Sequence, residues 1–446
     1  MRQQIPQPPD AGLVNAMRFG TDTFRFLDGI QRRFDDIAAV PIPGRAPLVV
    51  ITNPTLVHDA LSRPSEFSRI PAQGSAALIA EQGLVQSEGS LWRQQRSIMG
   101  PAFTGKQARA YANTVGEQLG DLVQEWANAD GEEQNLHREL TSLTIRVASE
   151  ILIGEDLGRD RAEQFYEWMQ ITGTEFEFSP TSVAPEWLPQ RTSTEFEEAA
   201  AGIHGMADDI IERRRATLGE DPDGRPTDML GLLLQAEDDP SVDYPTNQIR
   251  DEVATFLIAG HETTALSLTY TLSLLSWHDS MRNRVRDEAE AVLGEETPRY
   301  EHVADLEYTG HVYDEGLRLY PPAWAVFRRA DTTVRLGDYR VEEGSAVVMP
   351  LWSIHRDRLY FESPLSFTPD RWERRNKNST EAYLPFSTGP HACVGRQFAV
   401  SGATLTLARL TQMFDIDIPT DALNDLRATP TLRPGDGVPA VIRRAE

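Results

Sequence analysis

The segment from Thr264 to Trp277, TALSLTYTLSLLSW, is the most apolar stretch of the chain. Serine and threonine interrupt it, and no run of about 18 uncharged apolar residues occurs anywhere in the sequence. It therefore suits a buried helix better than a membrane span, within a longer helical segment from Thr246 to His278. Other long segments with helical periodicity cover residues 106–128, 135–154, 193–218, 281–293, 303–320 and 395–413.

Short β-branched pieces form a minor part of the pattern. Residues 47–51 predict one strand, and residues 334–349 predict several, separated by turns at 337–338 and 343–344. Residues 1–40 are polar to amphipathic and are expected to form an N-terminal lead-in, while the C-terminus predicts a last short β pair. A chain of 446 residues could hold two or three average domains, but no repeat or flexible linker divides it. We therefore expect one mainly α-helical domain over residues 1–446.

The chain carries a strong negative charge. Its formal net charge is −25 and its isoelectric point is near 4.8, and such a field argues against binding nucleic acids or anionic membranes. Of its 43 basic residues only Lys106 and Lys377 are lysines. Surplus carboxylates with scarce lysine suggest a halophilic protein, because concentrated salt screens the self-repulsion. An acidic, GC-rich genome is the alternative explanation.

The N-terminal sequence MRQQIPQPPDAG has neither the basic start nor the apolar core of a signal peptide. A single cysteine also excludes an intramolecular disulfide framework and suits a reducing compartment. These features predict a soluble cytoplasmic protein.

Cys393, the only cysteine, lies in the stretch FSTGPHACVG. Gly389 and Pro390 break regular structure before it, and a helix is expected to begin at Gly395. The amide-rich N-terminus of a helix stabilises negative charge on sulfur, so a thiolate is plausible. Taken alone, the residue leaves three roles open: a buried free thiol, a nucleophile or a single metal ligand.

The spacing of Phe386, Gly389, Cys393 and Gly395 resembles the haem-binding loop of the cytochrome P450 superfamily. In that family a cysteine thiolate ligates the haem iron. The resemblance therefore implies that Cys393 is the iron ligand, that haem b is the cofactor, and that Phe386 and Gly395 contact it.

The same resemblance implies the fold of that family, a helix-rich domain with a small β region. Residues 247–278 would form its long central helix, the I helix, and residues 386–395 its haem loop. Two positions depart from the usual pattern. Ser387 stands where the family most often has glycine, and His391 where it has arginine or, commonly in microbial members, histidine.

A second matching motif is GSLWRQQR, in which Trp92 and Arg96 share a helix face. It resembles the family's C-helix signature, which implies that both side chains donate to a haem propionate. Arg328, in preference to Arg329, and His391 would be further propionate donors. In isolation, Trp92 and Arg96 would more often be a packed tryptophan beside a solvated arginine.

Glu315 and Arg318 are three residues apart on a helix that ends before the sequence YPP. An isolated pair of this kind is usually a surface ion pair of little energetic value. Here it matches the family's Glu-x-x-Arg motif, and Arg371 in FTPDRW stands where the family has the completing arginine. The resemblance implies a structural network of these three side chains that holds the haem loop.

The sequence AGHETT, residues 259–264, interrupts the apolar central helix with glycine and consecutive threonines. Glycine inside a helix costs up to about 1 kcal/mol, and threonine hydroxyls can bend a helix by bonding its carbonyls. In the family this motif crosses the haem face and loosens the helix. The resemblance implies that Ala259 and Gly260 line that groove and that Glu262 and Thr263 relay protons for oxygen activation.

These motifs together imply a monooxygenase that inserts one atom of O2 into a C–H bond, with a ferredoxin and its reductase as electron donors. Arg374, Arg375, Lys377 and Arg396 could form a basic island for an acidic ferredoxin. Two rivals are a peroxide-driven peroxygenase, against which the Glu262-Thr263 pair speaks, and a non-catalytic haem protein that senses a ligand.

The segments that correspond to the family's substrate contacts are mostly apolar, which suits a fatty acid, a terpenoid or a steroid. Each of their side chains could equally be ordinary core. The candidate pocket residues are Leu78, Ile79, Leu84, Phe176, Phe178, Phe256, Trp324 and Val326.

Overall fold

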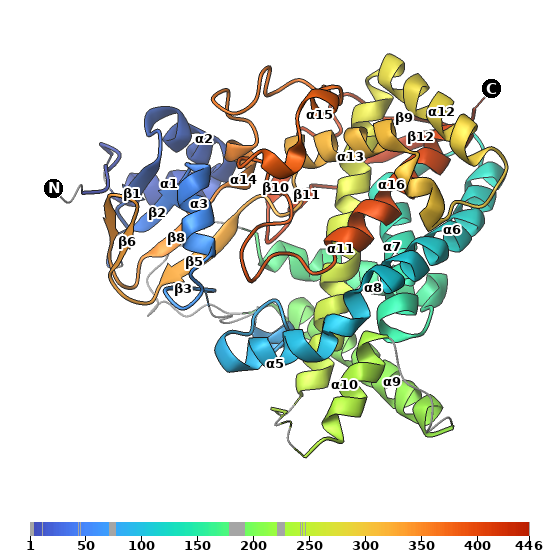
Figure 1. Ribbon diagram of the computed structural model, residues 1–446, viewed down its shortest axis with the longest axis horizontal. Coiled ribbons are helices and arrows are strands. Elements are labelled where there is room, and N and C mark those ends of the chain that lie inside the picture. The colour runs from blue at the N-terminus through green and yellow to red at the C-terminus, as the bar shows by residue number, and fades with distance from the viewer. Residues whose placement is uncertain are drawn as a thin grey trace.

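The computed structural model of the protein describes residues 4–10, 12–42, 44, 46–70, 77–177, 192–220, 228–240, 242, 244–245 and 247–445. Helices dominate this part of the chain (Figure 1). The α-helices are α1 Gly12–Thr21, α2 Thr23–Arg33, α3 Pro54–Leu61, α4 Ala77–Ala80, α5 Gly89–Met99, α6 Gly105–Asn128, α7 Leu136–Ile153, α8 Gly158–Glu175, α9 Thr194–Glu220, α10 Met229–Glu237, α11 Gln248–Ser276, α12 Asp279–Leu293, α13 Glu307–Leu319, α14 Leu351–Ile354, α15 Arg371–Arg374 and α16 Arg396–Met413.

In the described part of the chain, the strands form one larger sheet and three small ones. The larger sheet has five strands in the order β1-β2-β8-β5-β3, of which only β2 and β8 run parallel. The small sheets are β4-β12-β9, β10-β11 and β6-β7. The strands are β1 Ile37–Val40, β2 Leu48–Ile51, β3 Phe67–Ser68, β4 Glu133–Asn135, β5 Val326–Ala330, β6 Val334–Leu336, β7 Tyr339–Val341, β8 Ala346–Met349, β9 Phe414–Asp417, β10 Leu426–Ala428, β11 Leu432–Pro434 and β12 Pro439–Arg444.

The larger sheet separates two hydrophobic cores. Side chains alternate between the faces of a strand, and in β2 the residues Leu48 and Val50 join the main core while Val49 and Ile51 join the second. In Figure 1 this sheet and the N-terminal helices lie on one side of the molecule, and the long helices lie on the other. Both faces of β2 are buried, which explains its unbroken run of β-branched and leucine residues.

Helix α11 runs through the middle of the helical part (Figure 1). Its 29 residues give a length of roughly 44 Å, and most of them are buried. Helices α7, α13 and α16 pack around it. No helix in the described part of the chain is long and apolar enough to cross a membrane.

The structure confirms the predicted long helices and the short strands of residues 334–349. The interpretation of residues 1–40 as a mere lead-in was too simple, because α1, α2 and β1 form there. Helix α8 was not anticipated. Its buried positions Ala162, Phe165, Met169 and Thr172 do have helical spacing, but glycines at both ends and many charges obscure it.

Candidate active site around Cys393

The loop before α16 is held by its own backbone. The Cys393 amide donates to the Phe386 carbonyl at 3.0 Å, and the Ala392 amide donates to the Gly389 carbonyl at 3.1 Å. Gly389 has φ +77°, and a Cβ there would lie 2.3 Å from the Leu61 carbonyl oxygen. Glycine is therefore required at 389 both by conformation and by space.

Ser387 also adopts a left-handed conformation, with φ +59°. This is the position at which the sequence departs from the glycine of the family pattern. Its hydroxyl is buried and makes no hydrogen bond within the described part of the protein. The loop therefore keeps the shape that glycine would allow, at the cost of a strained serine.

Two amides at the start of α16, those of Gly395 and Arg396, donate to the Cys393 sulfur. Desolvation by the surrounding protein raises the pKa of the thiol, while these amides and the charges of Arg96 and Arg396 lower it. Cys393 is nevertheless exposed.

The middle of α11 also has residues that are not buried, which form an open strip of the helix. Ala259 is exposed and Thr263 is half-buried, in a helix whose neighbouring turns are buried. The Thr263 hydroxyl donates to the Ala259 carbonyl at 3.3 Å. Gly260 packs against α7, where a Cβ would touch Ala148 and Leu152 at 3.4 Å. The helix continues without a break, so the expected loosening is not visible as an interruption.

Tyr313 of α13 connects the cysteine loop with α11. Its hydroxyl lies 3.0 Å from the Ser267 hydroxyl of α11. It is close enough to Cys393 for the negative charge of a thiolate to add to the burial that raises the pKa of Tyr313. In Figure 1 α16, which follows the cysteine loop, crosses α11 near its middle.

Glu262 points away from this open strip. Its carboxylate accepts hydrogen bonds from Arg433 Nε at 2.5 Å and from the Thr431 hydroxyl at 3.0 Å. Burial would raise the pKa of Glu262, but the charge of Arg433 and these hydrogen bonds together hold it below its usual value. No hydrogen bond joins Glu262 to Thr263 in the described structure. Sequence reasoning missed Arg433, since nothing in the pattern RPG points to α11.

A cluster of cations lies beside His391. The guanidinium groups of Arg69, Arg96 and Arg328, together with desolvation by burial, lower the pKa of His391 to about 3, desolvation contributing most. Glu88 is the carboxylate of this cluster, 3.7 Å from His391 Nε2, and it accepts the Arg69 amide at 2.7 Å. Burial also lowers the pKa of Arg69 to about 10, which Glu88 opposes.

The charges of this cation cluster do not balance. With His391 neutral, the three arginines and Glu88 leave an excess of two positive charges. Arg328 is buried, and Arg69 and Arg96 are half-buried. Arg96 makes no ion pair with any described residue, and Arg328 Nη1 donates only to the carbonyl of Phe327, at 2.7 Å. Buried charges without partners are costly, so the cation cluster suits a ligand that carries two carboxylates.

The structure brings the side chains of Trp92 and His391 into contact. It also distinguishes the two candidate arginines, because Arg328 and Arg329 differ in burial and in their partners. The rings of Trp92 and His391 meet edge to face with centroids 4.3 Å apart. Arg328 is buried beside His391, whereas Arg329 is 45% exposed and pairs with Asp331 at 3.3 Å. Sequence reasoning missed Arg69, which follows β3 without any motif that distinguishes it.

Glu315, Arg318 and Arg371 form one buried network. Both arginines reach the Glu315 carboxylate, Arg318 at 2.8 Å and Arg371 at 2.9 Å, and Trp372 Nε1 donates to it at 3.0 Å. Arg318 also donates to the His355 carbonyl at 2.8 Å. These bonds tie α13 to the irregular segment that leads into the cysteine loop.

The candidate pocket residues differ in exposure. Ile79, Leu84 and Phe256 are buried, Phe176 and Val326 are half-buried, and Leu78 is exposed. Phe178 lies outside the described residues.

Trp324, which was expected to line the substrate pocket, lies in the core instead. It has no exposed surface, its Nε1 donates to the Thr429 carbonyl at 2.7 Å, and its ring packs on Phe24. It is a core residue. Phe256 similarly belongs to an aromatic stack, with the Phe103 ring 5.6 Å away.

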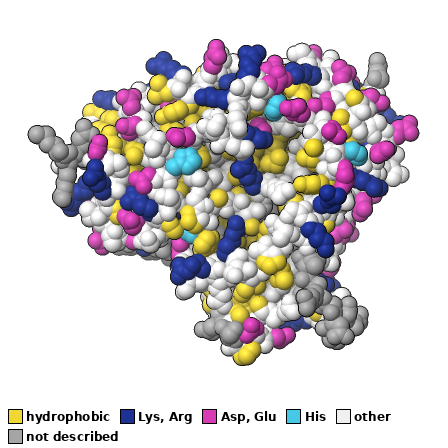
Figure 2. All heavy atoms as spheres, in the orientation of Figure 1, with side chains coloured by type: hydrophobic (Ala, Val, Ile, Leu, Met, Phe, Trp, Pro, Cys, Tyr) yellow, Lys and Arg dark blue, Asp and Glu magenta, His cyan; other side chains and the backbone are white. Residues whose placement is uncertain are grey.

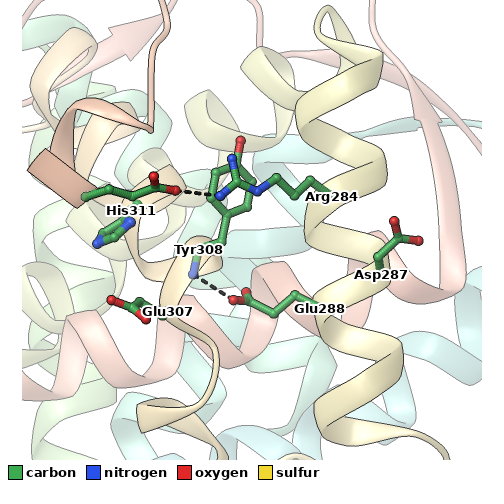
Figure 3. A pocket seen from close by; sticks show the side chains of 7 residues that line it. Arg284, Asp287, Glu288, Glu307, Tyr308 and His311 are labelled. Atoms are coloured by element: carbon green, nitrogen blue, oxygen red, sulfur yellow. Dashed lines mark hydrogen bonds and ion pairs between the residues drawn. The ribbon is translucent and has the colours of Figure 1, made fainter.

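A solvent-open hollow of about 580 Å³ lies elsewhere, between α12, α13 and α15 (Figure 3). Acidic side chains line most of it, and the Arg284 guanidinium lies 3.7 Å above the Tyr308 ring. Glu288 accepts the Tyr308 amide at 2.7 Å and so caps the start of α13. Of the carboxylates that line this hollow, Glu288 and Glu373 are bonded by described residues, and the hollow contains none of the residues around Cys393.

The residues around Cys393 fit a haem. One sulfur ligand with amide donors, an excess of two positive charges and an open strip of α11 match its iron, its two propionates and its flat ring. Gly395 has no neighbour that a Cβ would meet and a negative φ of −85°, so the protein itself does not require glycine there.

Comparison with known proteins agrees with this fit. The family model described as "Cytochrome P450" matches residues 6–434. Cyclooctatin synthase of Streptomyces melanosporofaciens is 31% identical over 374 residues, which are 82% of this chain and 80% of that protein. Cyclooctat-9-en-7-ol 5-monooxygenase of the same organism is 28% identical over 89% of this chain and 86% of its own length. The 11-oxo-beta-amyrin 30-oxidase of Glycyrrhiza uralensis is 28% identical over 90% and 79%.

Proposed function

Since the chain belongs to the cytochrome P450 family of monooxygenases, we propose that it inserts one oxygen atom of O2 into a C–H bond of a terpenoid-like substrate. The observation that carries this proposal is the shared surroundings of Cys393 and α11. The Cys393 sulfur has two amide donors, and a cation cluster with an excess of positive charge lies near it. The open strip of α11 presents the Thr263 hydroxyl.

Haem bound through a thiolate supplies the reductive activation of O2. The chain would supply the rest. Cys393 would ligate the iron, and the Gly395 and Arg396 amides would moderate how strongly its sulfur donates electrons. Arg69, Arg96 and Arg328, with Trp92 and His391, would hold the propionates. Thr263 would deliver a proton, and Glu262 would replenish it.

The open strip of α11 favours an apolar substrate. Ala259 offers only a carbon atom there, and Thr263 offers one hydroxyl, which already donates to a carbonyl at 3.3 Å. Such a surface recognises shape and apolar area. Terpenoids come first among the candidates because three similar proteins bear names that derive from cyclooctatin and beta-amyrin.

Electrons would come from a ferredoxin and its reductase. Of the four basic residues proposed for docking, Lys377 pairs with Asp314, and Arg396 donates to Asn378 at 3.1 Å. Arg374 is exposed and pairs with no described carboxylate, which makes it the most informative site. The variant Arg374→Glu should slow reduction by an acidic ferredoxin but leave reduction by dithionite unchanged.

The decisive experiment is the carbon monoxide difference spectrum of the dithionite-reduced, purified protein. A strongly red-shifted Soret band supports thiolate ligation, and Cys393→Ser should abolish that band. A Soret band typical of histidine-ligated haem, or the lack of any haem, would overturn the proposal. A pyridine haemochromogen spectrum of the extracted cofactor tests the assignment of haem b.

Substrate class can be tested by ligand titration of the oxidised haem spectrum. Diterpene alcohols and triterpenes should shift the spectrum, whereas a response confined to fatty acids or steroids would contradict the terpenoid assignment. Product formation with ferredoxin and reductase, and not with peroxide alone, would separate a monooxygenase from a peroxygenase. Tight binding without any product would indicate a sensor.

A further inference from the structure

The loop before α5, residues 81–88, lies on the N-terminal half of α11. Its closest approach is at Gly83, where a Cβ would lie 1.8 Å from the hydroxyl of Thr255, a buried residue. Thr255 is one helical turn, about 5.4 Å, before Ala259, so it continues the face of α11 that carries the open strip. The loop therefore closes the N-terminal end of that strip.

Two carboxylates of α11 hold this loop. Asp251 accepts the Gln82 amide at 2.9 Å, and Glu252 accepts the Leu84 amide at 3.0 Å. The Leu84 carbonyl is held as well, because Arg69 of the cation cluster donates to it at 2.9 Å. The backbone of Leu84 is therefore fixed between α11 on one side and the cation cluster on the other.

Glu252 has no exposed surface, and its second oxygen accepts Gln248 Nε2 at 3.1 Å. A charge there would be costly, and burial accordingly raises the pKa of Glu252 to about 8. Gln248 Oε1 is also buried and has no donor among the described atoms. The O–H group of a neutral Glu252 is the kind of donor that this small cluster lacks.

The charged groups around Glu252 favour its neutral form. Asp251, next to it on α11, adds repulsion to the burial that raises the pKa of Glu252. Burial also raises the pKa of Asp251, and the basic side chains of His204 on α9 and Arg250 on α11 oppose it there. The remaining titratable neighbours are acids, namely Glu81 of the loop and Tyr244. No cation of the described chain pairs with Glu252.

We propose that Glu252 is a positioning residue for the substrate: as a neutral acid it seats Gly83 and Leu84 on α11 and closes the strip, and when it is ionised it releases the loop. The proton goes to solvent, and water must enter to solvate the charge left behind, which requires Leu84 to move away from the helix. This inference rests on the proposed function, because the strip binds substrate only where haem is bound beside it.

The direct test is hydrogen–deuterium exchange of the loop in the haem-loaded enzyme, expressed relative to the intrinsic rate at each pH. Protection of the peptide that spans residues 81–88 should be high at neutral pH and fall above about pH 8, by at most about tenfold per pH unit because one proton is involved. Residues 403–410 of α16, which are all buried, should stay protected, and this control excludes global unfolding.

Glu252→Gln should keep the loop protected at every pH. Its amide oxygen can accept the Leu84 amide, and its NH2 group can supply the missing donor to Gln248 Oε1. A flat profile in the wild type would overturn the proposal, and so would an unchanged loss of protection in Glu252→Gln. If Glu252→Gln does not fold, Asp251→Asn decides. It removes the neighbouring negative charge, so the loss of protection should move to lower pH, and an unmoved midpoint would count against Glu252.

Gly83→Ala shows how the enzyme behaves with the loop released. Its Cβ overlaps the Thr255 hydroxyl, so the loop cannot be seated and should lack protection at every pH. Gly100→Ala, at the C-terminal end of α5, is the matched control, because a Cβ there meets no atom within 4 Å. It should behave as the wild type, and a protected loop in Gly83→Ala would contradict the seating.

The functional readout is the affinity of two azoles that bind haem iron through nitrogen, measured from the haem spectrum. N-dodecylimidazole carries an alkyl chain that can run along the strip to the loop, whereas imidazole is too short. From neutral to alkaline pH, the dissociation constant of N-dodecylimidazole should rise at least threefold in the wild type and stay constant in Glu252→Gln. That of imidazole should change in neither protein.

A released loop with unchanged affinity for N-dodecylimidazole would refute the role in substrate binding, and a parallel change for both azoles would do the same. The azole titrations require the carbon monoxide spectrum of thiolate-bound haem. Exchange of the loop does not depend on iron ligation, so failure of the proposed function is distinguishable from failure of this inference.

Discussion

At the scale of single residues, Thr263 carries the proposed delivery of protons. Among the described residues it is the one polar side chain on the open strip of α11, and its one hydrogen bond within this part of the chain goes to the Ala259 carbonyl at 3.3 Å. A weakly held hydroxyl can turn towards a second acceptor without losing a strong partner. This position supports the proton role proposed for it.

Replacing Thr263 by alanine should uncouple the enzyme. We expect product formation to fall by about tenfold or more, since one proton donor contributes 10²–10⁴-fold in enzymes generally. The same electrons should appear as peroxide. Haem content and substrate affinity should stay as in the wild type. Thr264→Ala is the matched control on a buried face of the helix, and full coupling in Thr263→Ala would refute the assignment.

The backbone conformation of Ser387 predicts that replacing this residue by glycine stabilises the protein. Its left-handed φ of +59° strains a serine, and its buried hydroxyl has no partner among the described atoms. Ser387→Gly should raise the free energy of unfolding by about 1 kcal/mol, because glycine removes a strain of roughly 1–2 kcal/mol and loses part of this through a more flexible unfolded chain. Denaturant unfolding measures the change. Ser387→Ala separates the effect of the hydroxyl, and a less stable Ser387→Gly would contradict the account.

At the scale of structural elements, two carboxylates of α11 hold the loop before α5. Asp251 accepts the Gln82 amide at 2.9 Å, and Glu252 accepts the Leu84 amide at 3.0 Å. A Cβ on Gly83 would lie 1.8 Å from the Thr255 hydroxyl, so the loop lies directly on the helix. The loop continues to Glu88, so it links α11 with the cation cluster.

The burial of Glu252 predicts that the free energy of unfolding depends on pH. Burial raises its pKa from 4.5 to about 8, so the folded chain holds this proton over a pH range in which the unfolded chain has released it. The contribution to the free energy of unfolding is complete below pH 4.5 and is lost as the pH rises to about 8. Glu252→Gln should lack this loss, whose slope is at most about 1.4 kcal/mol per pH unit. Unfolding curves across this range test it, and parallel curves for both proteins would contradict it.

The Glu315 network predicts a coupling between α13 and the haem loop. Arg371→Met leaves a buried carboxylate with one arginine fewer, which should cost about 3–5 kcal/mol. We also expect lower haem content, because the segment before the cysteine loop loses its anchor. The measurement is the ratio of haem to protein together with the denaturation midpoint. Arg374→Met, an exposed neighbour on the same short helix, should change neither quantity.

At the scale of the whole molecule, the charge of −25 should make stability depend on salt. Figure 2 shows acidic and basic side chains interspersed over one face, so local ion pairs partly offset the repulsion. The Debye length falls from about 30 Å at 0.01 M salt to about 3 Å at 1 M, which screens long-range repulsion most. The melting temperature should therefore rise with potassium chloride. Sucrose of equal osmolality is the control, and a falling melting temperature would contradict the halophile hypothesis.

The sequence alone determined most of the helices and strands and several groups of neighbouring site residues. Helical periodicity predicted α6, α7, α9, α11, α12, α13 and α16, because each has a repeating buried face that local spacing reveals. The motifs around Cys393, Glu315 and Trp92 predicted residues that the structure does bring near one another. These motifs are short, and their residue types carry the chemistry directly.

Only the tertiary structure decided which distant side chains meet. Arg69 joins the cation cluster and Arg433 joins Glu262, although 171 residues separate the last two along the chain. Trp324 became core because the chain packs Phe24 on it. Such contacts depend on how helices and hairpins pack, and packing is determined by volume and charge summed over the whole fold. Local periodicity reports which face of an element is buried, but it carries no information about the partner that covers it.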